Sequence, residues 1–262
     1  FMGPDQQKRL NTLIVQAGAQ LSAAGKVTLT VDDKTGRVTA STGVLVDLWV
    51  DRWGQDLGLK KIVDGHAQAV GRIYDVVIAT AAQTLTRNFN GESSMGSWMA
   101  DCLRHWSGAQ LAVVNGGGVR ADMQEGPVTL RHIFNIMPFD NYVVKLEMDG
   151  KLVREALDHG VGGTKGMMQV SGASLTYDRD APGGRRLSQV SVAGEPLDAA
   201  VRYRVATLDF VAKSGDGYNS FSRARKSDYT RTLAREVFNE CARKSRLIEA
   251  PERGRMKPAR GH

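Results

Sequence analysis

Three short motifs along the chain combine residue types that could bind a phosphate, a sugar and an aromatic base. The first places Asn115, three consecutive glycines and Arg120 directly after the apolar run 111–114. Consecutive glycines are costly in chain entropy, and they are expected where the backbone turns sharply or lies close to a ligand. An arginine beside them can bind a phosphate with its two-pronged guanidinium. A glycine-rich turn without a ligand is the alternative interpretation.

The second and third motifs each carry a phenylalanine next to polar loop residues. Phe139 lies in Pro-Phe-Asp-Asn, which ends at Asn141, and Phe210 is followed by Gly-Asp-Gly with Asp216 at its centre. A ring that faces a pocket can stack on a base for about 1–3 kcal/mol. A carboxylate can accept two hydrogen bonds from a cis-diol. Core packing is the usual role of a phenylalanine, but the neighbouring loop residues favour a binding site here.

In this order and at this spacing, the three motifs resemble the C-terminal domain of the 5'-nucleotidase family. That family includes UDP-sugar hydrolases and 2',3'-cyclic-nucleotide phosphodiesterases, and the similarity is clearest over residues 76–221. The resemblance implies a base held between two phenylalanine rings, ribose hydroxyls held by an aspartate, and a phosphate facing an arginine. The implied substrate-binding residues are Asn115, Arg120, Phe139, Asn141, Phe210 and Asp216.

Three positions depart from the family pattern. Gly91 stands near a position where the family often has an arginine, although Arg87 lies close by in the sequence. Asp140 replaces a more usual glycine, and we expect its carboxylate to weaken phosphate binding. Ser214 replaces the first glycine of Gly-Gly-Asp-Gly, which is a milder change. These departures bear on the affinity for phosphate more than on the nucleoside pocket.

The residues that would perform hydrolysis are not evident in this chain. The resemblance implies two divalent metal ions, held by aspartate, asparagine and histidine ligands in an N-terminal metallophosphatase domain. No two of the five histidines are spaced as such ligands, and His66 of Asp64-Gly65-His66 falls inside an expected helix. We therefore assign no catalytic residue, metal ligand or cofactor to the chain itself.

The implied function is recognition of a nucleotide or nucleoside by one half of a metal-dependent phosphoester hydrolase. Its partner would be its own N-terminal domain, which would receive the phosphate at the two metal ions. A non-catalytic nucleotide-binding or scaffold protein is the alternative. The expected division is 1–50 as the end of the metallophosphatase domain, 51–75 as a connector helix, 76–248 as the recognition domain and 249–262 as a basic, mostly disordered tail.

Composition limits the other classes of function. The formal net charge is +7, and much of the positive excess lies towards the C-terminus, so we do not infer nucleic-acid binding. No run of 18 apolar residues is present, and residues 1–9 lack the apolar core of a signal peptide. The resemblance places the protein in the periplasm or outside the cell. Cys102 and Cys241 leave a buried thiol or a disulfide between them as open alternatives.

The elements that must position these residues form a mixed α/β (α+β) pattern, in which a mixed sheet has flanking helices. Apolar residues at helical spacing predict a helix over 94–106, which Gly108 would end. The further helices expected are 59–74, 149–159, capped by Gly160, and 227–244, and the strands expected are 12–16, 26–31, 37–40, 76–79, 111–114, 142–148, 169–177, 189–192 and 203–207.

Overall fold

The computed structural model describes residues 15–18 and 21–259 of the chain. It divides into two compact units, Phe1–Gln68 and Ala69–His262, which we describe separately. The strand expected over 12–16 lies mostly outside the described residues, and its last two residues are not in a strand. Residues 1–9 also lie outside the described part.

The first unit contains an antiparallel hairpin of β1 (Ala23–Val31) and β2 (Val38–Asp47), which confirms the predicted pairing of 26–31 with 37–40. Its turn is held by the carboxylate of Asp32, which accepts hydrogen bonds from the backbone of Lys34 and Thr35 and from the Thr35 hydroxyl. These bonds, chiefly those from Thr35, lower the pKa of Asp32. The hairpin is followed by α2 (Val50–Trp53) and by α3 (Leu57–Tyr74), which matches the predicted helix at 59–74.

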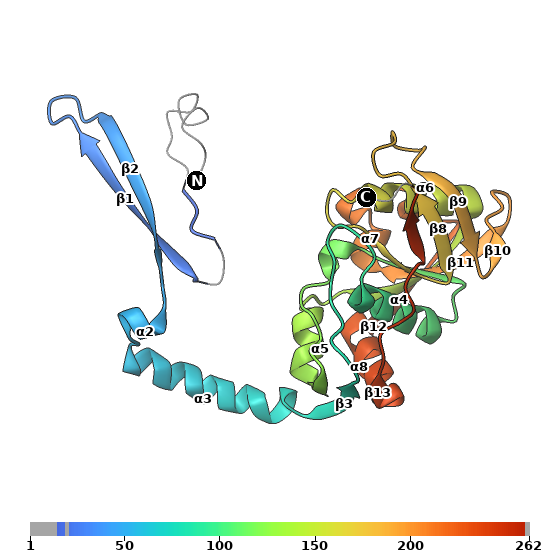
Figure 1. Cartoon of the computed structure of the whole chain (residues 1–262), viewed down its shortest axis with the longest axis horizontal. Coiled ribbons are helices and arrows are strands. Elements are labelled where there is room, and N and C mark those ends of the chain that lie inside the picture. Colours follow the sequence, from blue (N-terminus) through green and yellow to red (C-terminus); the bar gives the residue numbers. More distant parts are fainter. Residues whose placement is uncertain (1–14, 19–20, 260–262) are drawn as a thin grey trace. The chain divides into compact units, whose positions relative to one another are not determined.

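The second unit is a mixed α/β domain, as the sequence pattern predicts (Figure 1). Its helices are α4 (Ser94–Ser107), α5 (Leu130–Ile136), α6 (Gly150–Gly162), α7 (Asp209–Ala212) and α8 (Ala234–Ser245), with short 3-10 turns η1 (Gly116–Gly118), η2 (Gly215–Gly217) and η3 (Phe221–Arg223). Its strands are β3 (Val77–Ala81), β4 (Leu111–Val114), β5 (Gly126–Thr129), β6 (Tyr142–Asp149), β7 (Gln169–Ser171), β8 (Ala173–Tyr177), β9 (Leu187–Val192), β10 (Glu195–Pro196), β11 (Arg202–Leu208), β12 (Lys226–Leu233), β13 (Leu247–Ile248) and β14 (Met256–Pro258).

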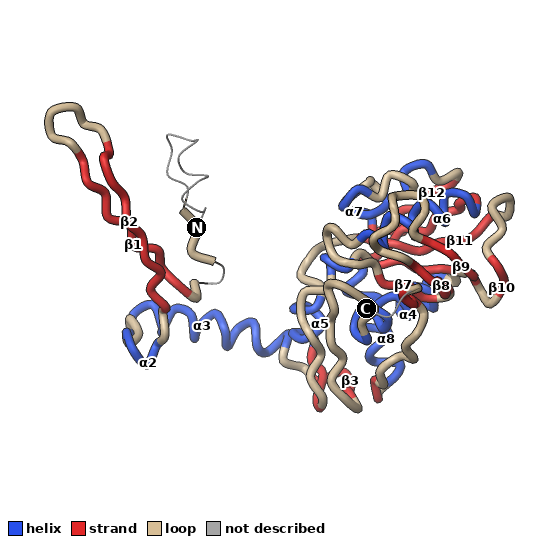
Figure 2. The backbone as a smooth tube through the Cα atoms, turned by 45° about the horizontal axis from the view of Figure 1, so that its top comes forward, coloured by secondary structure: helices blue, strands red, loops and turns tan. Residues whose placement is uncertain are grey.

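A five-stranded sheet in the order β12-β6-β11-β4-β7 forms the centre of this unit (Figure 2). β4 and β11 run parallel, and the other neighbours in the sheet are antiparallel. All four residues of β4 are buried, as expected for an apolar strand in the middle of a sheet. Two smaller sheets, β10-β9-β8-β14 and β13-β3-β5, complete the domain.

Helix α4 follows the predicted apolar stripe, with Met95, Met99 and Leu103 fully buried. Ser93 caps its first turn by accepting a hydrogen bond from the Gly96 amide, and Gly108 ends it in a left-handed conformation. Cys102 on this helix is not a free thiol, because it forms a disulfide with Cys241 of α8 across a Cα–Cα distance of 5.7 Å. Of the two states that the sequence leaves open, the structure therefore has the disulfide.

Three predicted elements differ from the structure by more than a shift of their ends or show a different cap. The helix expected over 227–244 is a strand, β12, in its first part and becomes α8 only at Ala234, because residues 226–229 and 233 pair with the edge of β6. The helix expected to end at Gly160 continues to Gly162 and is capped by Gly163, whose φ is +65°. The strand expected over 169–177 is divided at Gly172 into β7 and β8, which join different sheets.

The expectation of a mostly disordered tail over 249–262 is wrong for its described part. Residues of β14 pair with β8, and Arg255 forms a two-pronged ion pair with Asp101 of α4 at 2.8–2.9 Å. The carboxylate of Glu92 accepts hydrogen bonds from the amides of Gly254, Arg255 and Met256. Partner groups that come from distant parts of the sequence therefore order a segment whose composition alone favours disorder.

Candidate functional site

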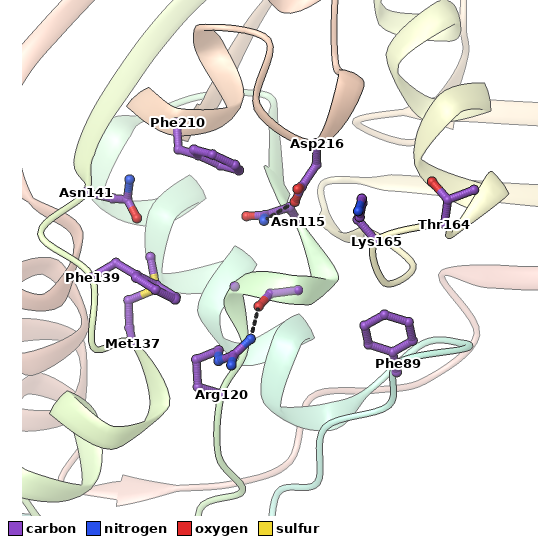
Figure 3. A pocket seen from close by; sticks show the side chains of 12 residues that line it. Phe89, Asn115, Arg120, Met137, Phe139, Asn141, Thr164, Lys165, Phe210 and Asp216 are labelled. Carbon is purple, nitrogen blue, oxygen red and sulfur yellow. Dashed lines mark hydrogen bonds between the residues drawn. The ribbon is translucent and has the colours of Figure 1, made fainter. Parts of the chain in front are cut away.

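A pocket of about 440 Å³ opens where the parallel strands β4 and β11 end (Figure 3). Ligands of open α/β sheets commonly bind in the crevice beyond the carboxyl ends of such strands. η1 follows β4 directly, and α7 follows β11, so both strands deliver their next residues to this place. The residues that line the pocket are Phe89, Asn115, Gly117, Gly118, Arg120, Met137, Phe139, Asn141, Thr164, Lys165, Phe210 and Asp216.

All six residues that the sequence analysis selected for substrate binding line this one pocket. They come from segments up to 101 residues apart in the chain, as between Asn115 and Asp216. In Figure 3, Phe210, Asn141 and Phe139 lie on one side, whereas Asp216 and Asn115 lie near the middle. The fold therefore brings the three sequence motifs together at one pocket.

The rings of Phe139 and Phe210 are not part of the apolar core. They are 42% and 44% exposed, whereas Phe221 and Phe238 are almost completely buried. A ring that stays exposed at a pocket removes little apolar surface from water when the chain folds. It buries that surface only when a ligand covers it. Their exposure excludes the core-packing interpretation that the sequence left open.

The loop that carries Phe139 and Asn141 is tied to the start of α7 through Asp209. The Asp209 carboxylate accepts hydrogen bonds from Asn141 Nδ2 and from the Tyr142 amide, both at 3.0 Å, and from Lys213 Nζ at 3.4 Å. Burial is the largest influence on Asp209 and opposes its ionisation, but these bonds together outweigh it and lower its pKa. The charged form of Asp209 thus helps to set the separation between the two phenylalanines.

Asp216 is held in place from both sides. Asn115 Nδ2 donates to Asp216 Oδ2 at 2.7 Å, and His159 Nε2 donates to the Asp216 carbonyl at 2.8 Å. His159 therefore bonds this loop, although its position beside Gly160 would also suit a contact with the C-terminus of its own helix. The His159 ring packs against Tyr218 at 4.7 Å, and burial, with the nearby Asp216 charge second, raises the pKa of Tyr218.

The backbone at Asp216 is itself unusual. Asp216 has φ +53° and Ser214 has φ +71°, both in the left-handed region that favours glycine. Conformations of this kind cost about 1–3 kcal/mol each and persist only where the surroundings impose them. The contacts from Asn115 and His159 are such surroundings, and they direct the Asp216 carboxylate into the pocket.

The consecutive glycines allow two loops to touch. A Cβ on Gly116 would lie 2.2 Å from the Met167 carbonyl, and one on Gly117 would lie 2.6 Å from the Lys165 carbonyl. Any larger residue would push the loop of Lys165 away from the pocket. Arg120, which follows, donates to the Gly117 carbonyl at 3.2 Å, and its guanidinium lies 5.9 Å from the centre of the Phe139 ring.

A second hollow of about 360 Å³ adjoins the first and shares Phe89, Gly117 and Arg120 with it. Its lining also includes Arg87, whose Nη1 donates to the Arg120 carbonyl at 2.9 Å. Two arginines therefore line a space next to the pocket of the phenylalanines, and Arg87 Nε also lies 4.0 Å from the Asp122 carboxylate. Such a pair is suited to binding a phosphate.

Asp140, which we expected to weaken phosphate binding, lies outside both hollows. Its carboxylate is paired with Arg235 at 2.7 Å. The expected repulsion of phosphate was inferred from the family pattern of the loop. That pattern does not include Arg235, which lies 95 residues further along the chain. The structure thus gives this carboxylate a partner within the protein.

Phe89, Thr164 and Lys165 also line the pocket but were not identified from the sequence. Phe89, which is 55% exposed, lies across the pocket from the other two rings in Figure 3, near Thr164 and Lys165. The segment Gly-Gly-Thr-Lys-Gly over 162–166, with a hydroxyl and an ammonium among glycines, was the signal that could have indicated Lys165. Phe89 carries no comparable signal.

The described residues contain no group of three or more histidine, cysteine, aspartate or glutamate side chains arranged to hold a metal ion. His66 lies within α3, as expected, and its neighbour Asp64 pairs with Lys60 on the same helix. The part of the chain that is described therefore does not supply the ligands that two divalent ions would need. None of its helices is both long and apolar enough to cross a membrane.

The mixed α/β domain, with its pocket where β4 and β11 end, has the fold of a known class of domain. A model of the 5'-nucleotidase C-terminal domain matches residues 70–223, more than half of the chain, and the chain therefore belongs to this family. It is 32% identical over 180 residues to the trifunctional nucleotide phosphoesterase protein YfkN of Bacillus subtilis (strain 168), covering 63% of this chain and 12% of that protein. It is 27% identical over 273 aligned positions to an apyrase of Tabanus yao, covering 94% of this chain and 49% of the apyrase.

Solved structures agree with this assignment. The 5'-nucleotidase precursor from Thermus thermophilus superimposes with a TM-score of 0.79 at 29% identity, over 90% of this chain and 50% of that one. This chain therefore spans about half or less of the length of the proteins that it matches here.

Proposed function

We propose that this chain recognises nucleotides, with the base stacked between Phe139 and Phe210 and the ribose hydroxyls bound by Asp216. The observation that carries the proposal is the convergence of the six residues on one pocket in which both rings are exposed. Rings in this position can stack on any base, so the proposal does not include a base preference. Asn141 Oδ1 can reach the edge of the base, because only its Nδ2 is bonded to Asp209.

The phosphate end of the ligand would lie in the adjoining hollow, between Arg87 and Arg120. Arg87 thereby supplies the positive charge that Gly91 does not, and Asp140 does not oppose it, because its carboxylate pairs with Arg235. Charge-assisted hydrogen bonds to phosphate are stronger and shorter than neutral ones. We therefore expect a nucleoside monophosphate to bind more tightly than its nucleoside.

In a longer protein, the chain would be the substrate-recognition half of a 5'-nucleotidase-like hydrolase that acts in nucleotide catabolism. Residues 1–50 would then be the end of the metallophosphatase domain, 51–75 the connector, and 76–248 the recognition domain, followed by the segment 249–262. The two divalent metal ions, and hence the hydrolysis, would belong to the N-terminal domain, since the described residues lack a ligand cluster.

A non-catalytic nucleotide-binding or scaffold protein is the second candidate. The observation in its favour is that the described residues form a pocket with two exposed phenylalanine rings but contain no group of metal ligands. The coding sequence that surrounds this chain distinguishes the two. An upstream Asp-x-His and Gly-Asn-His-Glu would support the hydrolase, and an upstream region without them would support the binding protein.

We place the protein in the periplasm or outside the cell. The disulfide between Cys102 and Cys241 supports this location, because disulfides persist mainly in oxidising compartments.

Calorimetric titration of the chain with adenosine, without metal, tests the proposed binding site. Phe210→Ala and Phe139→Ala should each weaken binding by about 1–3 kcal/mol, because each removes one stacking face. Trp49→Ala is the control, since Trp49 is also an exposed ring, at 66%, but lies outside the pocket. Equal affinity of the wild type and both phenylalanine variants would count against the proposal.

A further inference from the structure

Arg235, at the start of α8, binds the loop that carries Phe139 and Asn141. Its Nη1 donates to the carbonyls of Met137 and Phe139, both at 3.3 Å, and its Nη2 donates to Asp140 Oδ1 at 2.7 Å. One guanidinium thus bonds three positions, 137, 139 and 140, of a single short loop. Arg235 does not line the pocket itself.

The surroundings of Arg235 suit a fixed guanidinium rather than a mobile surface cation. Its side chain is only 15% exposed, and it lies 4.7 Å from the centre of the Phe134 ring, on which it can stack. The planar fork of an arginine can bond several acceptors at once, whereas a lysine offers a single point of charge. Asp140 is 78% exposed, so the ion pair alone contributes little, and the two carbonyl contacts carry more of the effect.

The helix that carries Arg235 is itself rigidly held. The Ala234 amide donates to the Asn141 carbonyl at 2.8 Å, which adds a backbone bond at the far end of the same loop. Phe238, one turn further along α8, is completely buried, and Cys241 joins the helix covalently to α4. The loop is therefore bonded to an element that packing and a disulfide both fix.

We propose that Arg235 is a positioning residue for the base subsite, which holds Phe139 and Asn141 at the separation from Phe210 that a base requires. Asp140, in the position where the family usually has glycine, is the carboxylate partner of that residue. The inference rests on the proposed nucleotide-binding function and extends it to a residue outside the pocket. A ring that is displaced by about 1 Å no longer stacks well on a base. The bonds from Arg235 to the loop should therefore affect the affinity for a nucleoside.

Hydrogen exchange of the loop tests the structural part of the proposal without any ligand. Arg235→Met keeps most of the apolar stem and removes the three donated bonds, so peptides covering 137–142 should exchange faster than in the wild type. Arg243→Met is the matched control, because Arg243 is an exposed arginine on the last turn of the same helix. Unchanged exchange in Arg235→Met would overturn the proposal, whatever the chain binds.

A double-mutant cycle with adenosine tests the functional part. In the wild-type background, Arg235→Met should weaken adenosine binding about tenfold, because displacement of the Phe139 ring removes most of one stacking contact. In a Phe139→Ala background it should cost less than about twofold, because the ring that it positions is gone. Arg235→Lys should recover part of the affinity, and thermal unfolding of each variant checks that the domain remains folded.

The outcomes separate the two proposals. An equal loss in both backgrounds would mean a general structural role and would overturn the positioning role. An Arg235→Met variant that binds adenosine as tightly as the wild type would also overturn the positioning role. A wild-type chain that fails to bind both adenosine and AMP would contradict the proposed function, while the exchange experiment would still decide whether Arg235 holds the loop.

Discussion

At the scale of single residues, the pocket combines groups that are fixed before any ligand arrives. Asp216 is bonded by Asn115 and its carbonyl by His159, while Asp209 holds Asn141. A preorganised site loses less entropy on binding than one that must order its side chains. Asp216 also has a left-handed backbone conformation, which the surrounding contacts must impose because it is costly on its own.

Asp216→Asn should reveal whether this carboxylate binds the ribose. The amide can still bond Asn115 but loses the charge that strengthens bonds from a diol, so adenosine binding should weaken by about 1.5–3 kcal/mol. Binding of 2',3'-dideoxyadenosine, which lacks both hydroxyls, should change little. Calorimetry with the two ligands measures the difference, and an equal loss for both would contradict the assigned role.

The sequence was sufficient to select six residues of the pocket, because they lie in motifs whose spacing identifies a family. It was not sufficient for Phe89, Lys165 or Arg235. Phe89 has no distinctive neighbours, and the proposed role of Arg235 depends on contacts with residues 137, 139 and 140, which lie at least 95 residues away in the sequence. The pairing of Asp140 with Arg235 could not be predicted for the same reason. Pairing between distant residues is the information that a single sequence does not supply.

At the scale of elements, the pocket depends on helices that are fixed to one another behind it. α4 and α8 are joined by the Cys102–Cys241 disulfide, and α8 in turn bonds the loop of Phe139 through Ala234 and Arg235. The bond closes a long segment, since 139 positions separate the two cysteines. Cross-links across long segments restrict the unfolded chain most strongly.

Loss of this disulfide should destabilise the domain. Replacing both cysteines by serine should lower the free energy of unfolding by about 2–5 kcal/mol, the usual effect of removing a native disulfide. Denaturant unfolding measures this change, with a reductant added to the wild type as a second route to the same state. The reductant should have no effect on the double variant. An equally stable double variant would show that the cross-link adds nothing beyond the packing of α4 on α8.

Elements with a strong apolar period, and the local hairpin of β1 and β2, were predicted well, whereas β12 and β14, which pair with distant strands, were not. The stripe of α4 and the buried run of β4 fix both elements locally. Residues of β12 have no such period, and they form a strand because the edge of β6 offers them hydrogen bonds. The ordered segment near Arg255 has the same cause, since its partners Glu92 and Asp101 lie more than 150 residues away.

At the scale of the whole molecule, every residue of the pocket belongs to the second unit, Ala69–His262. The site that we propose for nucleotides is therefore built from the second unit alone, and we expect this chain to bind a nucleoside without a catalytic domain. The chain spans about half or less of its relatives, so hydrolysis is a property to seek in a longer protein.

A crystal structure of this chain with adenosine tests the central claim most directly. We predict the base between the rings of Phe139 and Phe210, the ribose hydroxyls within hydrogen-bond distance of the Asp216 carboxylate, and the 5' carbon directed towards Arg87 and Arg120. Adenosine bound elsewhere, or a pocket that stays empty at a concentration where calorimetry detects binding, would contradict it.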